Sequence, residues 1–118
     1  MATKATVHSL RALGESFPLF TLGTFLSTTK SLQWKANYRT MAVSLVSFLQ
    51  SNGLTTRQVF DCSTEMPDDF QIIVGDLTDE GLIFYRDAVP KWMRRLDKGD
   101  SKDDVSSLNK SLASMRES

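Results

Sequence analysis

The segment from Thr78 to Gly99 carries the most complete helix signature in the chain. Thr78 can accept a hydrogen bond from a free amide at a helix start, and Asp79 and Glu80 suit the positive end of the helix dipole. Apolar side chains then recur at intervals of three and four residues, at Leu82, Tyr85, Val89, Trp92 and Leu96. Gly99 follows a cluster of cations and ends the pattern. The signature predicts a helix with one buried face, kinked where Pro90 removes a backbone donor.

Two further segments indicate helices in the middle of the chain. A helix from about Ser31 or Trp34 to Ser51 would place six apolar side chains on one face: Tyr38, Met41, Ala42, Leu45, Phe48 and Leu49. Asn52-Gly53 follows and favours the left-handed backbone that ends a helix. Residues 55–60 begin with a threonine and a glutamine at the spacing of a capping box, so a short helix is predicted there.

The first 30 residues divide into two predicted helices. One face of the first carries Val7, Leu10, Leu13 and Phe17. Ser16-Phe17-Pro18 suits the start of the second helix, which carries Leu19, Leu22 and Leu26. Residues 70–74 are apolar and β-branched, which fits a short buried strand or an extended segment packed against helices, and the sequence offers no evident partner strand.

These segments predict a mainly α protein: a compact single-domain bundle of about five helices, with one short strand at most near 70–74. A length of 118 residues suits one core. Residues 1–99 form the predicted domain, and residues 100–118 form a linker followed by a weak terminal helix or a disordered tail. The longest apolar stretch is too short to span a bilayer and no secretory signal is apparent, so we expect a cytoplasmic protein without membrane contact.

Charge is distributed unevenly although the formal net charge is zero. Residues 1–60 hold six cations and one acid, whereas residues 61–80 hold seven carboxylates and no cation. The segment 81–98 is basic again, with five cations and two acids. The acidic segment predicts either a negative surface that attracts a basic partner or a set of charges that the basic helices neutralise on folding.

The residue types that usually carry catalysis or bind metals are scarce. His8 is the only histidine and Cys62 the only cysteine, so the chain can form neither an internal disulfide nor a cysteine and histidine metal cluster. It has no phosphate-binding glycine loop and no nucleophile elbow. We therefore expect no enzyme activity, no metal and no cofactor. Trp34 and Trp92 are both in phase with apolar stripes, which favours core or interface positions over a platform for nucleic acid bases.

A DNA-binding regulator is the second functional hypothesis. Residues 48–60 have the order of a helix-turn-helix, with Arg57 and Gln58 at the start of the predicted second helix. The acidic segment follows immediately and would repel phosphates. Nucleic acid is therefore not the expected partner.

Five tracts form a pattern that lies mainly in the C-terminal half: Asn52-Gly53-Leu54-Thr55, Asp69-Phe70, Asp76-Leu77-Thr78-Asp79-Glu80-Gly81-Leu82, Lys91-Trp92 and Asp97-Lys98-Gly99. The pattern resembles that of small bacterial immunity-type proteins, which neutralise a toxin. The resemblance implies a cognate toxin or effector, often a nuclease, whose active face this protein would occlude. An acidic surface suits a basic nuclease cleft. The contact candidates are Glu65, Asp68, Asp69, Asp76, Asp79 and Glu80, with Tyr85 or Trp92 as anchors where exposed. Homo-oligomers are also compatible with the sequence.

Overall fold

The computed structural model describes residues 4–28, 31–61, 65–99 and 104–117, without the side chains of residues 4–6. The described chain is mainly α with five α-helices and a short strand near residues 70–74, as predicted, and this strand pairs with a second one in a small antiparallel sheet. The elements follow in the order α1 (Lys4–Arg11), β1 (Pro18–Thr21), α2 (Leu22–Ser27), α3 (Leu32–Ser51), β2 (Gln71–Ile73), η1 (Val74–Asp76), α4 (Asp79–Asp97) and α5 (Ser106–Glu117). None of the described helices is both long and apolar enough to cross a membrane.

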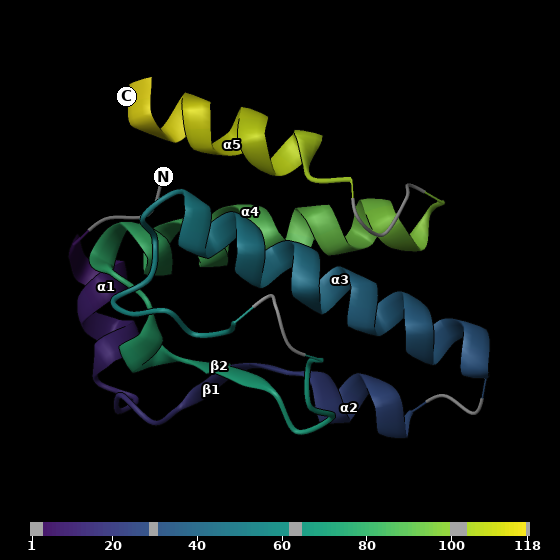
Figure 1. Ribbon diagram of the computed structural model, residues 1–118. Helices are drawn as coiled ribbons and strands as arrows, with labels where there is room; N and C mark the ends of the chain where they lie inside the picture. Colours follow the sequence, from purple (N-terminus) through teal and green to yellow (C-terminus); the bar gives the residue numbers. More distant parts are fainter. Residues whose placement is uncertain (1–3, 29–30, 62–64, 100–103, 118) are drawn as a thin grey trace.

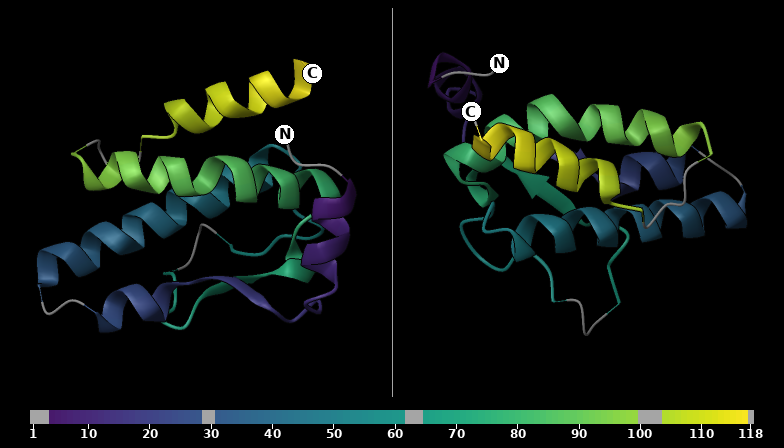
Figure 2. Two further views of the ribbon diagram at one scale, coloured as in Figure 1. Left: turned by 180° about the vertical axis from the view of Figure 1, so that it is seen from behind. Right: turned by 90° about the horizontal axis from the view of Figure 1, so that it is seen from above.

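The long helices α3 and α4 form the centre of the molecule (Figure 1). Helix α5 lies along the outer side of α4, whereas the sheet and α2 lie on the opposite side of the molecule, below α3 (Figures 1 and 2). Helix α1 and the end of α5 lie at one end of the molecule, and α3 begins at the other (Figure 1). The core fills the space between these layers.

The two strongest predicted helices are confirmed. Ser31 caps the start of α3, where its side chain accepts a hydrogen bond from the backbone N–H of Trp34. Five of its six predicted stripe residues are buried, and Tyr38 is half-buried. Thr78 caps the start of α4, where its hydroxyl accepts a hydrogen bond from the backbone N–H of Gly81 at 3.0 Å. The helix continues through Pro90 to Asp97 without interruption.

The predicted second helix near Pro18 is wrong at its start. Residues Pro18–Thr21 form β1, which pairs with β2, and the helix begins only at Leu22. The spacing of the leucines matches a helix, but β2 offers unpaired backbone groups and this tertiary pairing overrides the local preference. Helix α1 also ends earlier than predicted, so Leu13 and Phe17 are 50% and 43% exposed instead of buried.

The predicted short helix at residues 55–60 is absent. Thr55 instead forms an isolated antiparallel bridge with Leu77. The backbone N–H of Thr56 donates to the carbonyl of Asp76, and its hydroxyl donates to the carbonyl of Gly75, both at 2.8 Å. The segment is extended because its polar groups bond to a neighbouring backbone instead of capping a helix.

The described part of the C-terminal tail is helical and packed. Leu108 and Leu112 of α5 are buried and belong to the same core as α3 and α4. The indole N–H of Trp92 donates to the carbonyl of Asp104 at 2.8 Å, immediately before the helix. Residues 104–117 therefore extend the domain that was predicted to end at residue 99.

Candidate functional site

Six of the seven carboxylates of the acidic segment, all except Asp61, form two groups, which we call the carboxylate hub (residues 76–80) and the acidic loop (residues 65–69). The centre of the hub is Asp76, which is only 3% exposed. Its carboxylate accepts from the guanidinium of Arg57, with Nε at 3.0 Å and the nearer terminal nitrogen at 2.9 Å. It also accepts from the backbone N–H of Ile73 at 3.1 Å. The structure therefore places Asp76, a predicted contact residue, in the interior, where its carboxylate bonds to groups of this chain.

The other two hub carboxylates are also paired with arginines of this chain. Arg11 donates to Asp79 through Nε at 3.2 Å and a terminal nitrogen at 2.9 Å. Arg116 donates to Glu80 at 3.0 and 3.2 Å, and the carboxylate raises the pKa of Arg116. Arg116 also donates to the carbonyl of Asn52. The hub thus fastens α1, the segment after α3, and α5 to the start of α4.

The backbone packs tightly at this junction. A Cβ atom at Gly81 would lie 2.2 Å from the carbonyl oxygen of Leu54, which leaves room for glycine only. Leu77 and Leu82 are completely buried. The tract from Asp76 to Leu82 therefore has a structural explanation at nearly every position, independent of any partner.

The acidic loop is different because its carboxylates face solvent. Asp68 pairs with Arg39 at 2.6 Å, yet its side chain remains 70% exposed. Glu65 and Asp69 are exposed, and neither has an ion-pair partner among the residues that the structure describes. Cys62, the single cysteine of the chain, lies outside the described residues.

Of the two aromatic contact candidates, Trp92 is buried and Tyr85 is half-buried against the core. The Tyr85 hydroxyl donates to the carbonyl of Leu19 at 3.0 Å, and burial raises the pKa of the Tyr85 phenol. Trp92 is 2% exposed. Trp92 was predicted to be an anchor only if its side chain is exposed, and the fold buries it.

Trp34 is the exposed tryptophan, and the sequence pattern did not distinguish it from Trp92. Its indole is 41% exposed and packs on Tyr38, with ring centroids 5.9 Å apart. Tyr38 packs on Phe25 at 5.1 Å, and Phe25 stacks on the buried Phe20 at 5.5 Å. An aromatic column therefore leads from the core to the surface at the start of α3. The signal for its exposure was position, since Trp34 lies at the N-terminal limit of the apolar stripe.

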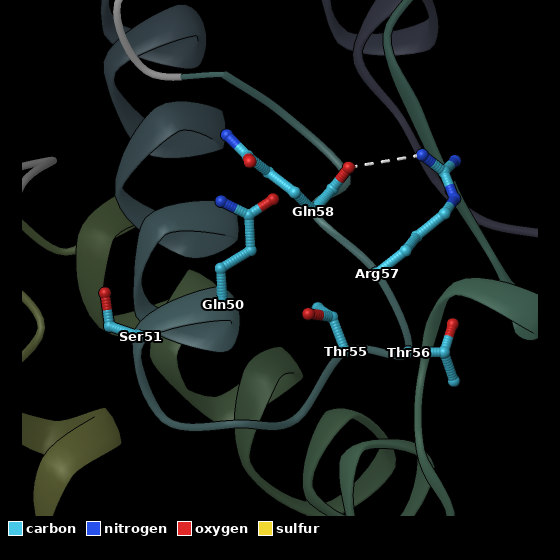
Figure 3. Close-up of a pocket in the computed structure, with 6 residues that line it drawn as sticks. All are labelled: Gln50, Ser51, Thr55, Thr56, Arg57 and Gln58. Atoms are coloured by element: carbon cyan, nitrogen blue, oxygen red, sulfur yellow. Dashed lines mark hydrogen bonds between the residues drawn. The ribbon is translucent and has the colours of Figure 1, made fainter.

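A polar cavity of about 440 Å³ lies beside the end of α3 (Figure 3). Gln50, Ser51, Thr55, Thr56, Arg57 and Gln58 line it. The Gln50 amide is engaged on both sides, since it accepts from the N–H of Phe60 at 2.7 Å and donates to its carbonyl at 3.0 Å. The Arg57 guanidinium points away from Gln50 (Figure 3), toward Asp76. The lining groups thus mainly hold the extended segment in place.

No grouping of three or more histidine, cysteine, aspartate or glutamate side chains suited to a metal ion occurs in the described parts of the chain. No protein family model, curated protein or solved structure matches this chain. The resemblance to immunity-type proteins therefore stays a prediction from the sequence pattern.

Proposed function

We propose that this protein is an immunity-type inhibitor that binds a cognate bacterial toxin and occludes a basic active face, such as that of a nuclease. The observation that supports the proposal is the acidic loop, which presents Glu65, Asp68 and Asp69 to solvent within five residues. A basic cleft that binds polyanions would be attracted to such a surface and oriented by it. We therefore place the proposed toxin interface at the acidic loop and not at the carboxylate hub.

The acidic loop is held in a defined shape. Met66 and Phe70, which lie on either side of Asp68 and Asp69, are buried at 5% and 8% exposure. The N–H of Phe70 donates to the carbonyl of Pro67 at 3.1 Å, and Arg39 ties Asp68 to α3. A preorganised turn loses little conformational entropy on binding, which favours tight association.

The DNA-binding hypothesis loses its main structural premise. Residues 55–60 are extended, so the described chain has no second helix after the turn at Asn52-Gly53. Arg57, the cation predicted to face DNA, is engaged by the buried carboxylate of Asp76.

The test begins with an N-terminally tagged protein used to capture its partner from the native host. The captured protein is then expressed with and without this chain, and toxicity that appears only without it supports the immunity function. Binding of the purified pair is measured for the double variant Glu65→Gln, Asp69→Asn against a matched control, Asp97→Asn, which alters an exposed acid on α4.

We expect the loop variant to weaken binding roughly tenfold at low salt, and less at high salt because the interaction is screened. The control should bind like the unmodified protein. A captured partner that is harmless when expressed alone would overturn the immunity function. A toxic partner whose binding is unchanged by the loop variant would leave that function standing and remove the acidic loop from the interface.

A further inference from the structure

The aromatic column that ends at Trp34 also reaches the acidic loop. Phe70, the buried residue that follows Asp69, packs on Phe20 with ring centroids 6.5 Å apart. From Phe20 the column continues through two further rings to the exposed indole of Trp34. The four steps between rings, of 6.5, 5.5, 5.1 and 5.9 Å, together span at most about 23 Å. The acidic loop and the indole are therefore connected by one continuous row of packed rings.

Helix α2 lies between the acidic loop and the exposed indole. The backbone N–H of Leu22, the first residue of α2, donates to the carbonyl of Phe70 at 2.9 Å. In Figures 1 and 2 the loop meets the start of α2, and α3 begins near the other end of α2. The helix has no charged residue, and its exposed side chains are the short ones of Thr24 and Ser27. A partner can therefore lie across α2 without meeting a charge or a long side chain of this helix.

The Trp34 indole has the properties of a binding anchor. It is 41% exposed, and Tyr38, one turn further along α3, packs against it. A side chain supported by a packed ring loses little conformational freedom when a partner covers it. Tryptophan is also enriched among the few residues that dominate the binding energy of protein interfaces. The indole can thus supply the affinity that exposed carboxylates, which mainly attract and orient a partner, do not.

We propose that Trp34 is the aromatic anchor of the toxin interface, and that the indole and the acidic loop contact one basic face of the same toxin across α2. The inference rests on the proposed function and adds a second contact region to it. A standard interface covers about 800 Å² per partner, a patch roughly 30 Å across, so one face can hold both regions. Arginines at the edge of a polyanion-binding cleft are the expected toxin contacts, because a guanidinium pairs with carboxylates and stacks on an indole.

The experiment measures association and dissociation rates of the purified, captured toxin by surface plasmon resonance. Trp34→Ala should weaken binding at least about tenfold, mainly through faster dissociation. This loss should change little with salt, whereas the loss caused by Glu65→Gln with Asp69→Asn should shrink as salt screens the charges. Phe17→Ala is the matched control, because Phe17 is 43% exposed and lies at the far end of β1 from α2. This control should bind like the unmodified protein.

Fluorescence quenching by acrylamide reports on the indole directly. Trp34 should be quenched in the free protein and protected in the complex. The difference between the unmodified chain and Trp34→Phe isolates this signal from that of Trp92, which is 2% exposed, and from the toxin's own tryptophans. Urea denaturation checks that each variant is folded under the binding conditions. Should Trp34→Ala unfold, Trp34→Phe keeps a ring against Tyr38 and should still weaken binding measurably.

The outcomes separate the anchor from the proposed function. A toxic partner that binds the folded Trp34 variants as tightly as the unmodified chain, or leaves the indole open to acrylamide, would overturn the anchor while the immunity function stands. Loss of binding for Trp34→Ala without any loss for the loop variant would overturn the shared face. Equal loss for Phe17→Ala would do the same, because the effect would not be specific to this face. A captured partner that is harmless when expressed alone would overturn the proposed function, and the toxin anchor with it.

Discussion

The acidic loop and the carboxylate hub each hold three carboxylates within five residues, and they differ in what the fold brings to them. The hub meets arginines from three remote segments, Arg11, Arg57 and Arg116. The described ion pairs bring the loop only Arg39. Equal charge density in the sequence therefore has two outcomes, a structural junction in one stretch and a solvent-facing surface in the other.

Position in the fold decides between these outcomes. The hub lies at the start of α4, where α1, the extended segment after α3, and the end of α5 converge. The loop lies against α2, with its backbone 3.5 Å from a Cβ position built on Gly23. Carboxylates at a convergence of segments are neutralised by the molecule itself, and carboxylates on a peripheral turn stay available to a partner.

The largest expected effect comes from breaking the hub at its buried member. Asp76→Ala removes the acceptor for Arg57 and for the N–H of Ile73, and we expect it to lower the free energy of unfolding by about 3 kcal/mol. The estimate is at the low end for a buried pair because the Arg57 side chain is 60% exposed and can be rehydrated. Urea denaturation measures the loss. Asp69→Ala in the loop is the control, and equal losses for the two variants would contradict the assignment of Asp76 to the interior.

A smaller effect is expected at Tyr85, a predicted contact that the fold has placed beside β1. Tyr85→Phe removes the hydrogen bond to Leu19 and should lower the free energy of unfolding at pH 7 by about 1 kcal/mol. Burial raises the pKa of the Tyr85 phenol in the folded state above its value in the unfolded chain, which is near 10. The contribution of Tyr85 to stability is therefore complete below pH 10, and it is lost as the pH rises further.

A comparison of the unmodified chain with Tyr85→Phe separates the ionisation of Tyr85 from that of other groups that titrate at alkaline pH. The stability difference between the unmodified chain and Tyr85→Phe should shrink above pH 10, because only the unmodified chain ionises this phenol on unfolding. Urea denaturation of both proteins between pH 7 and 11 measures the difference. A difference that stays constant over this range would show that the phenol ionises equally in both states.

The sequence predicted the parts of the fold that depend on local order. The apolar stripes and caps of α3 and α4 lie within one segment each, so periodicity located both helices. Strand β1 was missed because its partner, Gln71–Ile73, lies about 50 residues away and supplies the pairing that overrides a helical pattern. The helix expected at residues 55–60 failed for the same reason, since Thr56 bonds to the hub backbone.

The sequence predicted which acidic residues could form the candidate site, but only partly which of them face solvent. The carboxylates were evident as a group, but the arginines that neutralise the hub lie 68, 19 and 36 residues from their partners, and no spacing rule connects them. Trp34 and Trp92 are both in phase with their apolar stripes, although Trp34 lies at the N-terminal limit of its stripe and Trp92 lies within its own. Only the packed structure shows that covering elements reach Trp92 and stop short of Trp34.

The smallest expected effect on stability comes from removing charges in the acidic loop. Glu65→Gln with Asp69→Asn should change the free energy of unfolding by less than about 0.5 kcal/mol, because both carboxylates are exposed and removing them relieves repulsion around Asp68. Asp79→Asn in the hub breaks a pair whose carboxylate is 71% exposed, so its loss should be below about 1 kcal/mol and should shrink in high salt. Thermal denaturation at two salt concentrations separates the two variants. If the loop variant instead lost as much stability as the hub variant, with the same response to salt, its carboxylates would be structural, and the acidic surface available to a partner would no longer exist.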